Sequence, residues 1–258
     1  MSKISLGERM KRYEDVSRYY LMRRNPVIIR LDGKSFHSFT RGFLKPYDEI
    51  LIKVMQQTLQ MLCDSIEGCV IGYTQSDEIS LVLCDYRRLD SEAWFDYNIL
   101  KLCSVSASMT TAAFNRFFRQ MTEGMGGVYE KRLDKAFFDA RAFSLPKEEV
   151  NNYFVWWQRD AVRNSVRATA QAYFSSKQLH GVSREQSLEM LKAERSVDWN
   201  SFPLHLQRGS CCIKVPQLLN EGTEREVLRE VWKLDEEIPI FSDNPDYVNS
   251  CIQFGDEV

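Results

Sequence analysis

Short apolar runs and long amphipathic stretches alternate along the first 146 residues, and their order limits the fold more than any other feature. The run "VIIRL" is apolar at nearly every position and rich in β-branched residues, which is typical of a buried strand. Apolar residues at helical spacing, and polar turns between short apolar runs, define the elements that follow. The predicted elements are a strand at 27–31, a helix at 46–66, strands at 69–73 and 79–84, a helix at 92–120 and a strand at 136–145.

The order strand, helix, strand, strand, helix, strand predicts a ferredoxin-like α+β fold, with an antiparallel sheet and two helices on one face. We assign 1–146 to this domain and expect a helix near its N-terminus, over 5–24. The remainder, 147–258, is predicted to be a mainly helical extension with a short β element. Its expected elements are helices at 148–175 and 184–195 and a strand at 211–215, followed by a mixed tail.

Carboxylates follow two strands that this topology makes neighbours. Asp32 comes directly after the first strand, while Asp77 and Glu78 lie in the turn that leads into the third strand. The third strand runs antiparallel to the first, so we expect the three acids at one edge of the sheet. Like charges held close there call for a cation, and two Mg²⁺ ions about 4 Å apart can clamp a phosphoryl transfer. Gly33 would let the backbone approach a metal or phosphate closely.

A single Asp-Gly after a strand is more often a simple turn, so the hypothesis depends on the combination of Asp32 and Gly33 with Ser76, Asp77 and Glu78. Basic residues near these acids are candidates for neutralising a triphosphate, although each alone is commonly a solvated surface residue. These residues are Lys34, His37, Lys45 and Lys101.

A second candidate surface lies on the helix predicted at 148–175. Arg159, Arg163 and Arg167 are spaced by four, which places three guanidinium groups along one helix face. Such a row can follow an RNA backbone, or it can pair with acids such as Asp160. The aromatic residues beside it are predicted to belong to the core rather than to stack on bases.

The composition excludes several classes of protein. The 34 basic and 36 acidic residues give a net charge of −2, so any nucleic-acid surface must be local. The three His residues are not spaced as a zinc pair, and the chain has neither a GxSxG nor a Walker motif. Seven Cys residues form no CxxC pair, and no apolar segment resembles a signal or a membrane span. We therefore expect a cytoplasmic protein without a membrane partner.

Two stretches, "IIRLDGKSFHSFTRGFLKPYDE" and "GYTQSDEISLVL", resemble the motifs of the histidine tRNA guanylyltransferase family, reverse polymerases that add nucleotides to RNA 5′ ends. The resemblance continues through "FFDARAFSLP" and more loosely to "LQRGSCCIK". It implies a palm domain, two Mg²⁺ ions, tRNA and nucleoside triphosphates as partners, and a homotetramer. The implied reaction activates a 5′-monophosphate with ATP or GTP, after which the 3′-hydroxyl of a further nucleotide attacks the activated end.

The resemblance also implies roles for individual residues. Asp32 and Asp77 would bridge the metals, with the Gly33 carbonyl as a ligand and Glu78 assisting. The residues that would bind the nucleotide are Lys34, Phe36, His37, Lys45, Asp48, Ser76 and Lys101, and those that would contact RNA are Arg159, Arg163, Asn164 and Arg167.

One departure from the family pattern bears on the substrate. Eukaryotic members carry His-Ile-Asn-Asn-Leu-Tyr-Asn after the palm, whereas this chain has "VRNSVRA", with Val162 for the His and Ser165 for the second Asn. This resembles the like-protein branch, found in bacteria and archaea, which implies templated repair of 5′-truncated tRNA. Three alternatives remain open at this point: addition of a single G to histidine tRNA, a nucleotide cyclase, and a non-catalytic tRNA-binding protein.

Overall fold

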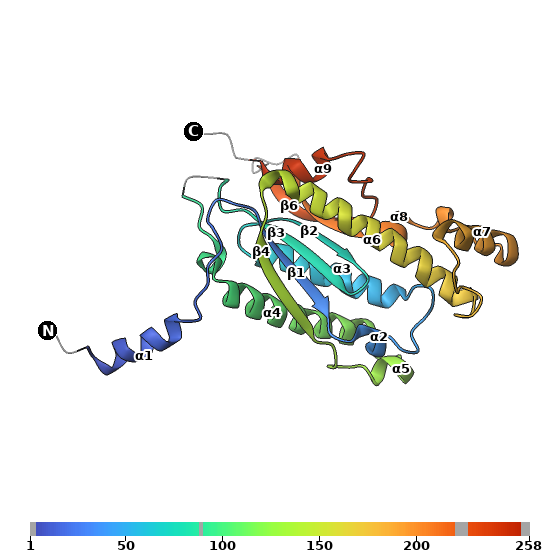
Figure 1. Cartoon of the computed structure of the whole chain (residues 1–258), viewed down its shortest axis with the longest axis horizontal. Helices are drawn as coiled ribbons and strands as arrows, with labels where there is room; N and C mark the ends of the chain where they lie inside the picture. Colours follow the sequence, from blue (N-terminus) through green and yellow to red (C-terminus); the bar gives the residue numbers. More distant parts are fainter. Residues whose placement is uncertain (1–3, 88–89, 220–226, 254–258) are drawn as a thin grey trace.

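A single antiparallel sheet organises the molecule, a computed structural model that describes residues 4–87, 90–219 and 227–253 (Figure 1). Within these ranges six strands pair in the order β4-β1-β3-β2-β5-β6. Their bounds are β1 Val27–Gly33, β2 Cys69–Gln75, β3 Glu78–Leu83, β4 Phe138–Ser144, β5 Ser210–Leu219 and β6 Val227–Asp235. The run β4-β1-β3-β2 is the ferredoxin-like order, so the predicted fold class is confirmed.

Two helices cover one face of the sheet. Helix α3 (Glu49–Ser65) and helix α4 (Ile99–Met121) pack against each other and against the β1 side chains Val27, Ile29 and Leu31, which are fully buried. Helix α3 begins where the Asp48 side chain accepts a hydrogen bond from the backbone N–H of Leu51. The helix predicted at 92–120 starts later, at Ile99, because a short 3₁₀ turn, Trp94–Tyr97, precedes it.

Helix α6 (Lys147–Tyr173) covers the opposite face. Its Phe154 and Trp157 pack in one buried cluster with Ile28 of β1 and Val82 of β3. Strand β1 is therefore buried on both faces, which explains why its sequence is an apolar run rather than an alternating pattern.

The C-terminal part contributes more strand than the sequence predicted. The strand expected at 211–215 is part of β5, which spans 10 residues and pairs with β2 of the palm through Ile71 and Ile213. Strand β6 lies in the region expected to be a mixed tail. Its sequence, "VLREVWKLD", is exposed over its first half and carries charges on both faces, so it lacks the alternation that marks a half-buried strand. The division at 146 stays a prediction.

The N-terminal segment is less helical than expected. Helix α1 covers Leu6–Asp15, whereas the prediction ran to 24. It buries no residue and extends away from the sheet (Figure 1). Beyond it the chain has turns on either side of a β-bridge between Tyr20 and Asn98, and the backbone N–H of Leu21 donates to the carbonyl of Tyr97.

Short helices complete the described part of the chain, and no helix in that part is long and apolar enough to cross a membrane. The short helices are α2 Phe36–Phe39, α5 Gly127–Glu130, α7 Arg184–Arg195, α8 Leu204–Arg208 and α9 Asp246–Asn249, with 3₁₀ turns at Trp199–Ser201 and Ser250–Ile252.

Candidate active site

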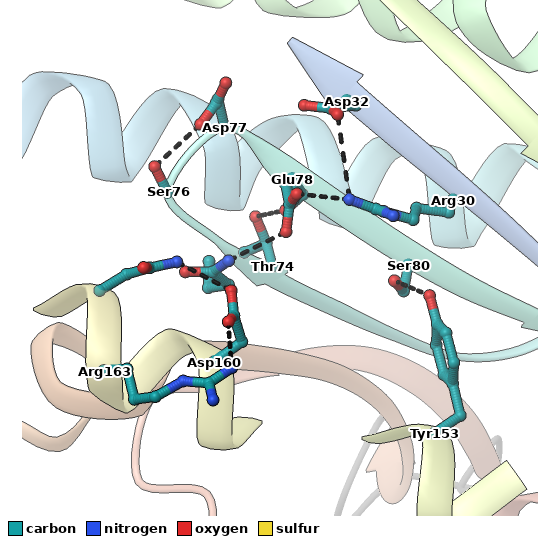
Figure 2. Close-up of polar contacts among 12 residues, drawn as sticks. Arg30, Asp32, Thr74, Ser76, Asp77, Glu78, Ser80, Tyr153, Asp160 and Arg163 are labelled. Atoms are coloured by element: carbon teal, nitrogen blue, oxygen red, sulfur yellow. Dashed lines mark hydrogen bonds and ion pairs between the residues drawn. The ribbon is translucent and has the colours of Figure 1, made fainter. Parts of the chain in front are cut away.

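The end of β1 and the β2–β3 turn meet at one edge of the sheet. Asp32 pairs with Glu78 in the β1–β3 register, and the backbone N–H of Gly33 donates to the carbonyl of Asp77 over 3.1 Å. The geometric prediction that these acids share an edge is confirmed. Two segments far apart in the sequence thus present their carboxylates side by side (Figure 2).

Burial determines the electrostatics of this edge. It raises the pKa of Asp77 above its usual value, the Ser76 hydroxyl opposes this rise by donating to Asp77 over 2.9 Å, and the charge of Asp32 adds to it. Burial also raises the pKa of Glu78, and the bond from Arg30 offsets part of that rise. Asp77 and Glu78 are therefore harder to ionise than in water, and a cation at this edge would favour their charged forms.

Arg30 already supplies one cation, and the sequence analysis did not single it out. Its Nη2 donates to Glu78 over 2.7 Å and lies 3.9 Å from Asp32 (Figure 2). Gln75 donates to the other oxygen of Glu78 over 3.0 Å, so both oxygens of this acid have partners within the chain. Of the three acids predicted from the sequence, Asp32 and Asp77 are left to accept an added cation. The sequence could have pointed to Arg30 because it is a charged residue inside an otherwise apolar strand.

Gly33 also lies against a neighbouring aromatic ring. A Cβ atom at this position would lie 2.3 Å from Cδ2 of Phe36. Phe36 is 4% exposed and packs against Phe114 and Phe138. The close approach is therefore that of an aromatic ring, while the predicted contact of the Gly33 backbone with a metal stays a prediction.

A cavity of about 580 Å³ opens beside Asp77 and is bounded by α2, the segment before α3, the β2–β3 turn and α6. Eight of the predicted residues line it, and they come from all four of these segments: Phe36, His37, Lys45, Asp48, Ser76, Asp77, Asn164 and Arg167. The structure therefore gathers most of the predicted nucleotide-binding residues and two of the predicted RNA-binding residues at one place.

Asp48 has a structural role as well as a place in this cavity. Besides the N–H of Leu51, it accepts hydrogen bonds from the N–H of Leu44 and from the hydroxyl of Tyr129. Its carboxylate thus holds the start of α3 in place. Lys34 directly follows β1, is exposed, and is fixed by a 2.8 Å bond from its N–H to the carbonyl of Phe137.

The structure does not bring Lys101 to this edge within one chain. Lys101 lies in the first turn of α4, with its Nζ 5.4 Å from the ring centre of Phe95. Thr111, about 15 Å further along the helix, is the α4 residue that bonds to Phe138 beside Gly33. Helix α4 runs along the sheet, so its first turn is at the opposite edge.

Strand β4 adds two charged residues that the analysis also missed. Asp139 is directly opposite Asp32 and Arg141 is directly opposite Arg30, and both are exposed. Residues paired in this way point to the same face of a sheet. The sequence could have pointed to Asp139 and Arg141 because an acid and a base occupy alternate positions in "FDAR".

The family model of the tRNAHis guanylyltransferases matches residues 7–146, more than half of the chain and the part that holds both acidic motifs. The chain belongs to this family. The bacterial tRNA(His) guanylyltransferase-like protein in complex with ATP has a similar structure, with a TM-score of 0.85 and 39% identity, over 97% of this chain and 100% of that one. A complex of such a protein with GTP matches with a TM-score of 0.76 and 36% identity, over 95% and 98% of the two chains.

Proteins similar in sequence to this family member come from a virus and from a mammal. Uncharacterized protein R259 of Acanthamoeba polyphaga mimivirus is 29% identical over 96% of this chain and 88% of its own length. The probable tRNA(His) guanylyltransferase of Bos taurus is 26% identical over 78% and 68% of the two chains. The family identifies the protein as a nucleotidyltransferase, and the matches support nucleotide addition to tRNA.

The donor set of this family member fits Mg²⁺. Within the described residues, no three or more His, Cys, Asp or Glu side chains are grouped to hold a metal ion. Asp32 and Asp77 provide two carboxylates beside a cavity that Lys45 and Arg167 also line. Mg²⁺ is commonly bound by one or two carboxylates together with phosphates rather than by a full protein cage, so this arrangement suits it.

Proposed function

We propose that this protein adds nucleotides to the 5′ end of truncated tRNA in the 3′-to-5′ direction, copying the opposite strand, after activating the 5′-monophosphate with ATP or GTP. The observation that carries the proposal is the meeting of Asp32 and Asp77 beside a cavity that His37, Lys45 and Arg167 line. These cationic and imidazole groups suit a triphosphate, and reactions of this kind depend mainly on positioning and charge stabilisation.

Asp32, Asp77 and the carbonyl of Gly33 would hold two Mg²⁺ ions. When bound, the ions neutralise and polarise the phosphate groups. Asp77 must be ionised to accept a cation, and the Ser76 hydroxyl favours that form. Glu78, which already pairs with Arg30 and Gln75, would assist by holding the cationic Arg30 beside Asp32.

The helix that follows the palm supports templated repair rather than obligate addition of one G. Ser165, at the second Asn position of the eukaryotic motif, is buried, and its hydroxyl bonds to Tyr47 and Trp199. Val162 is half-buried and offers no imidazole. The two solved relatives described above are both like-proteins, bound to ATP and to GTP.

Helix α1 supports the homotetramer of this proposal. Leu6, Met10 and Tyr13 recur at helical spacing and are 66%, 45% and 71% exposed. A lone helix of 10 residues is marginal in water, so contact with other copies of the chain would stabilise it. A cytoplasmic location agrees with seven free cysteines.

The test is an extension assay on 5′-monophosphorylated tRNA that lacks its first nucleotide, with all four nucleoside triphosphates and Mg²⁺. We expect one added nucleotide complementary to the opposite base, and a different nucleotide when that base is changed. An untemplated G on histidine tRNA alone would favour the single-addition alternative. A cyclic nucleotide formed without RNA would favour a cyclase, and salt-sensitive tRNA binding without any product would favour a binding protein.

A further inference from the structure

A second cavity with basic walls lies between α6 and α7. Its volume is about 470 Å³, and Arg163, Arg167, His180 and Arg184 are among its lining residues. None of the residues that line it carries a carboxylate, while Val166 and Leu179 provide apolar wall. A cavity with this lining is suited to an anion that presents several oxygens.

The arginines of this cavity are free to turn toward a ligand. Arg163 pairs with Asp160, three residues before it, and Arg184 pairs with its neighbour Glu185. Both pairs lie at the surface, where ion pairs contribute little stability. Arg167 is exposed and lies one helical turn beyond Arg163. Reorienting these side chains therefore costs little.

The second cavity shares part of its wall with the first. Arg167 and Gln171 line both the cavity at Asp77 and the cavity between α6 and α7. Arg163, Arg167 and Gln171 follow one another at intervals of four along α6, which makes a polar row on one helix face. An extended polyanion whose end lies at Asp77 can reach the second cavity along this row.

We propose that the cavity between α6 and α7 binds backbone phosphates of the RNA strand whose 5′ end is extended at Asp32 and Asp77. This inference depends on the proposed function for the identity of its ligand. It assigns RNA contact to Arg184 and His180 of the α7 region, which lie outside the row of α6 residues that the sequence indicated. The triphosphate of a nucleotide has the same phosphate chemistry and is the competing source of a ligand.

The first test measures the affinity for a 5′-monophosphorylated tRNA lacking its first nucleotide as the salt concentration rises. We expect Arg184→Ala to weaken binding about fivefold or more and to lower the slope of log affinity against log salt by about one, whereas Arg184→Lys keeps most of the affinity. The control is Arg195→Ala on the same helix, because Arg195 stacks on Phe174 outside the cavity lining. Equal losses in Arg184→Ala and Arg195→Ala would overturn the inference.

The second test separates the two sources of phosphate. The affinity for ATP should be unchanged in Arg184→Ala, and a matching loss of ATP affinity would overturn the assignment to RNA. A single neutral methylphosphonate near the 5′ end of the tRNA should weaken binding to the wild type but not weaken Arg184→Ala further. If no phosphate near the 5′ end behaves in this way when it is replaced, while nucleotides are still added, the inference fails and the proposed function stands. If RNA binding responds as expected but no nucleotide is added, the proposed function fails instead.

Discussion

Arg30 donates a 2.7 Å hydrogen bond to Glu78 while its guanidinium lies 4.0 Å from the ring centre of Trp157. One residue of β1 thus joins an acid of the β2–β3 hairpin to an aromatic residue of α6. Arg30, which has little exposure, therefore fixes the acidic edge of the sheet relative to α6, the helix that carries the predicted RNA contacts.

Replacing one partner of the Arg30–Glu78 pair should lower the free energy of unfolding more than replacing both partners. Arg30→Met leaves Glu78 partly buried without its cation, and we expect a loss of about 2 kcal/mol in the free energy of unfolding. Adding Glu78→Gln to Arg30→Met should restore most of that loss because no charge is then left unpaired. Urea unfolding of the two single variants and the double variant measures this; strictly additive losses would show that the pair does not act as a unit.

Ionised Asp77 should destabilise the free protein at neutral pH. Because its pKa is raised in the folded state, its charged form is less favourable there than in the unfolded chain. The stability associated with this group is present at low pH and is lost as the pH rises through the raised pKa. We therefore expect Asp77→Asn to melt at a higher temperature than the wild type at pH 7, with a difference that narrows on acidification. A lower melting temperature at pH 7 would contradict this.

The pH at which nucleotide addition is lost on acidification should depend on Ser76. The Ser76 hydroxyl lowers the pKa of Asp77, so Ser76→Ala should raise that pKa and move the loss of activity on acidification to higher pH. The measurement is the rate of nucleotide addition as a function of pH. The control is Ser108→Ala, which removes an exposed hydroxyl bonded to its own helix. It should leave the pH dependence of the rate unchanged.

Gly33→Ala tests the contact between β1 and α2. The added methyl group would meet the buried Phe36 ring, and overpacking of this kind costs about 1–3 kcal/mol. A second substitution, Phe36→Leu, should remove part of the clash, so the double variant should be more stable than the sum of the single losses predicts. Gly7→Ala in α1 has free space around it and should not destabilise the fold. Denaturant unfolding compares the three, and an unaffected Gly33→Ala would refute the packing explanation.

The core of the fold and the acidic edge could be predicted because local patterns determine them. The apolar run of β1 and the polar turn before Glu78 fix the strand order, and the order places Asp32 beside the turn. Strand β6 could not be predicted because its exposed, charged sequence gains its pairing only from β5. The environment of Arg30 depends on Glu78, 48 residues away, and on Trp157 in another element.

The position of Lys101 depends on the direction of α4, which sequence position alone does not give. The resemblance implied that Lys101 binds the nucleotide; within one chain α4 places it at the opposite edge of the sheet, and its role stays a prediction. Sequence spacing fixes the periodicity of a helix and not which of its ends lies at a site; the direction in which α4 crosses the sheet decides that.

The central claim is that Asp32 and Asp77 act together as the acids of one nucleotide-adding site. Its most direct test is single-turnover addition to a 5′-truncated tRNA by Asp32→Asn and Asp77→Asn, with Asp64→Asn on the exposed side of α3 as the matched control. We predict that each of the first two variants loses at least about 10²-fold in rate while remaining folded, and that Asp64→Asn matches the wild type. Wild-type rates in either Asp32→Asn or Asp77→Asn would contradict the account.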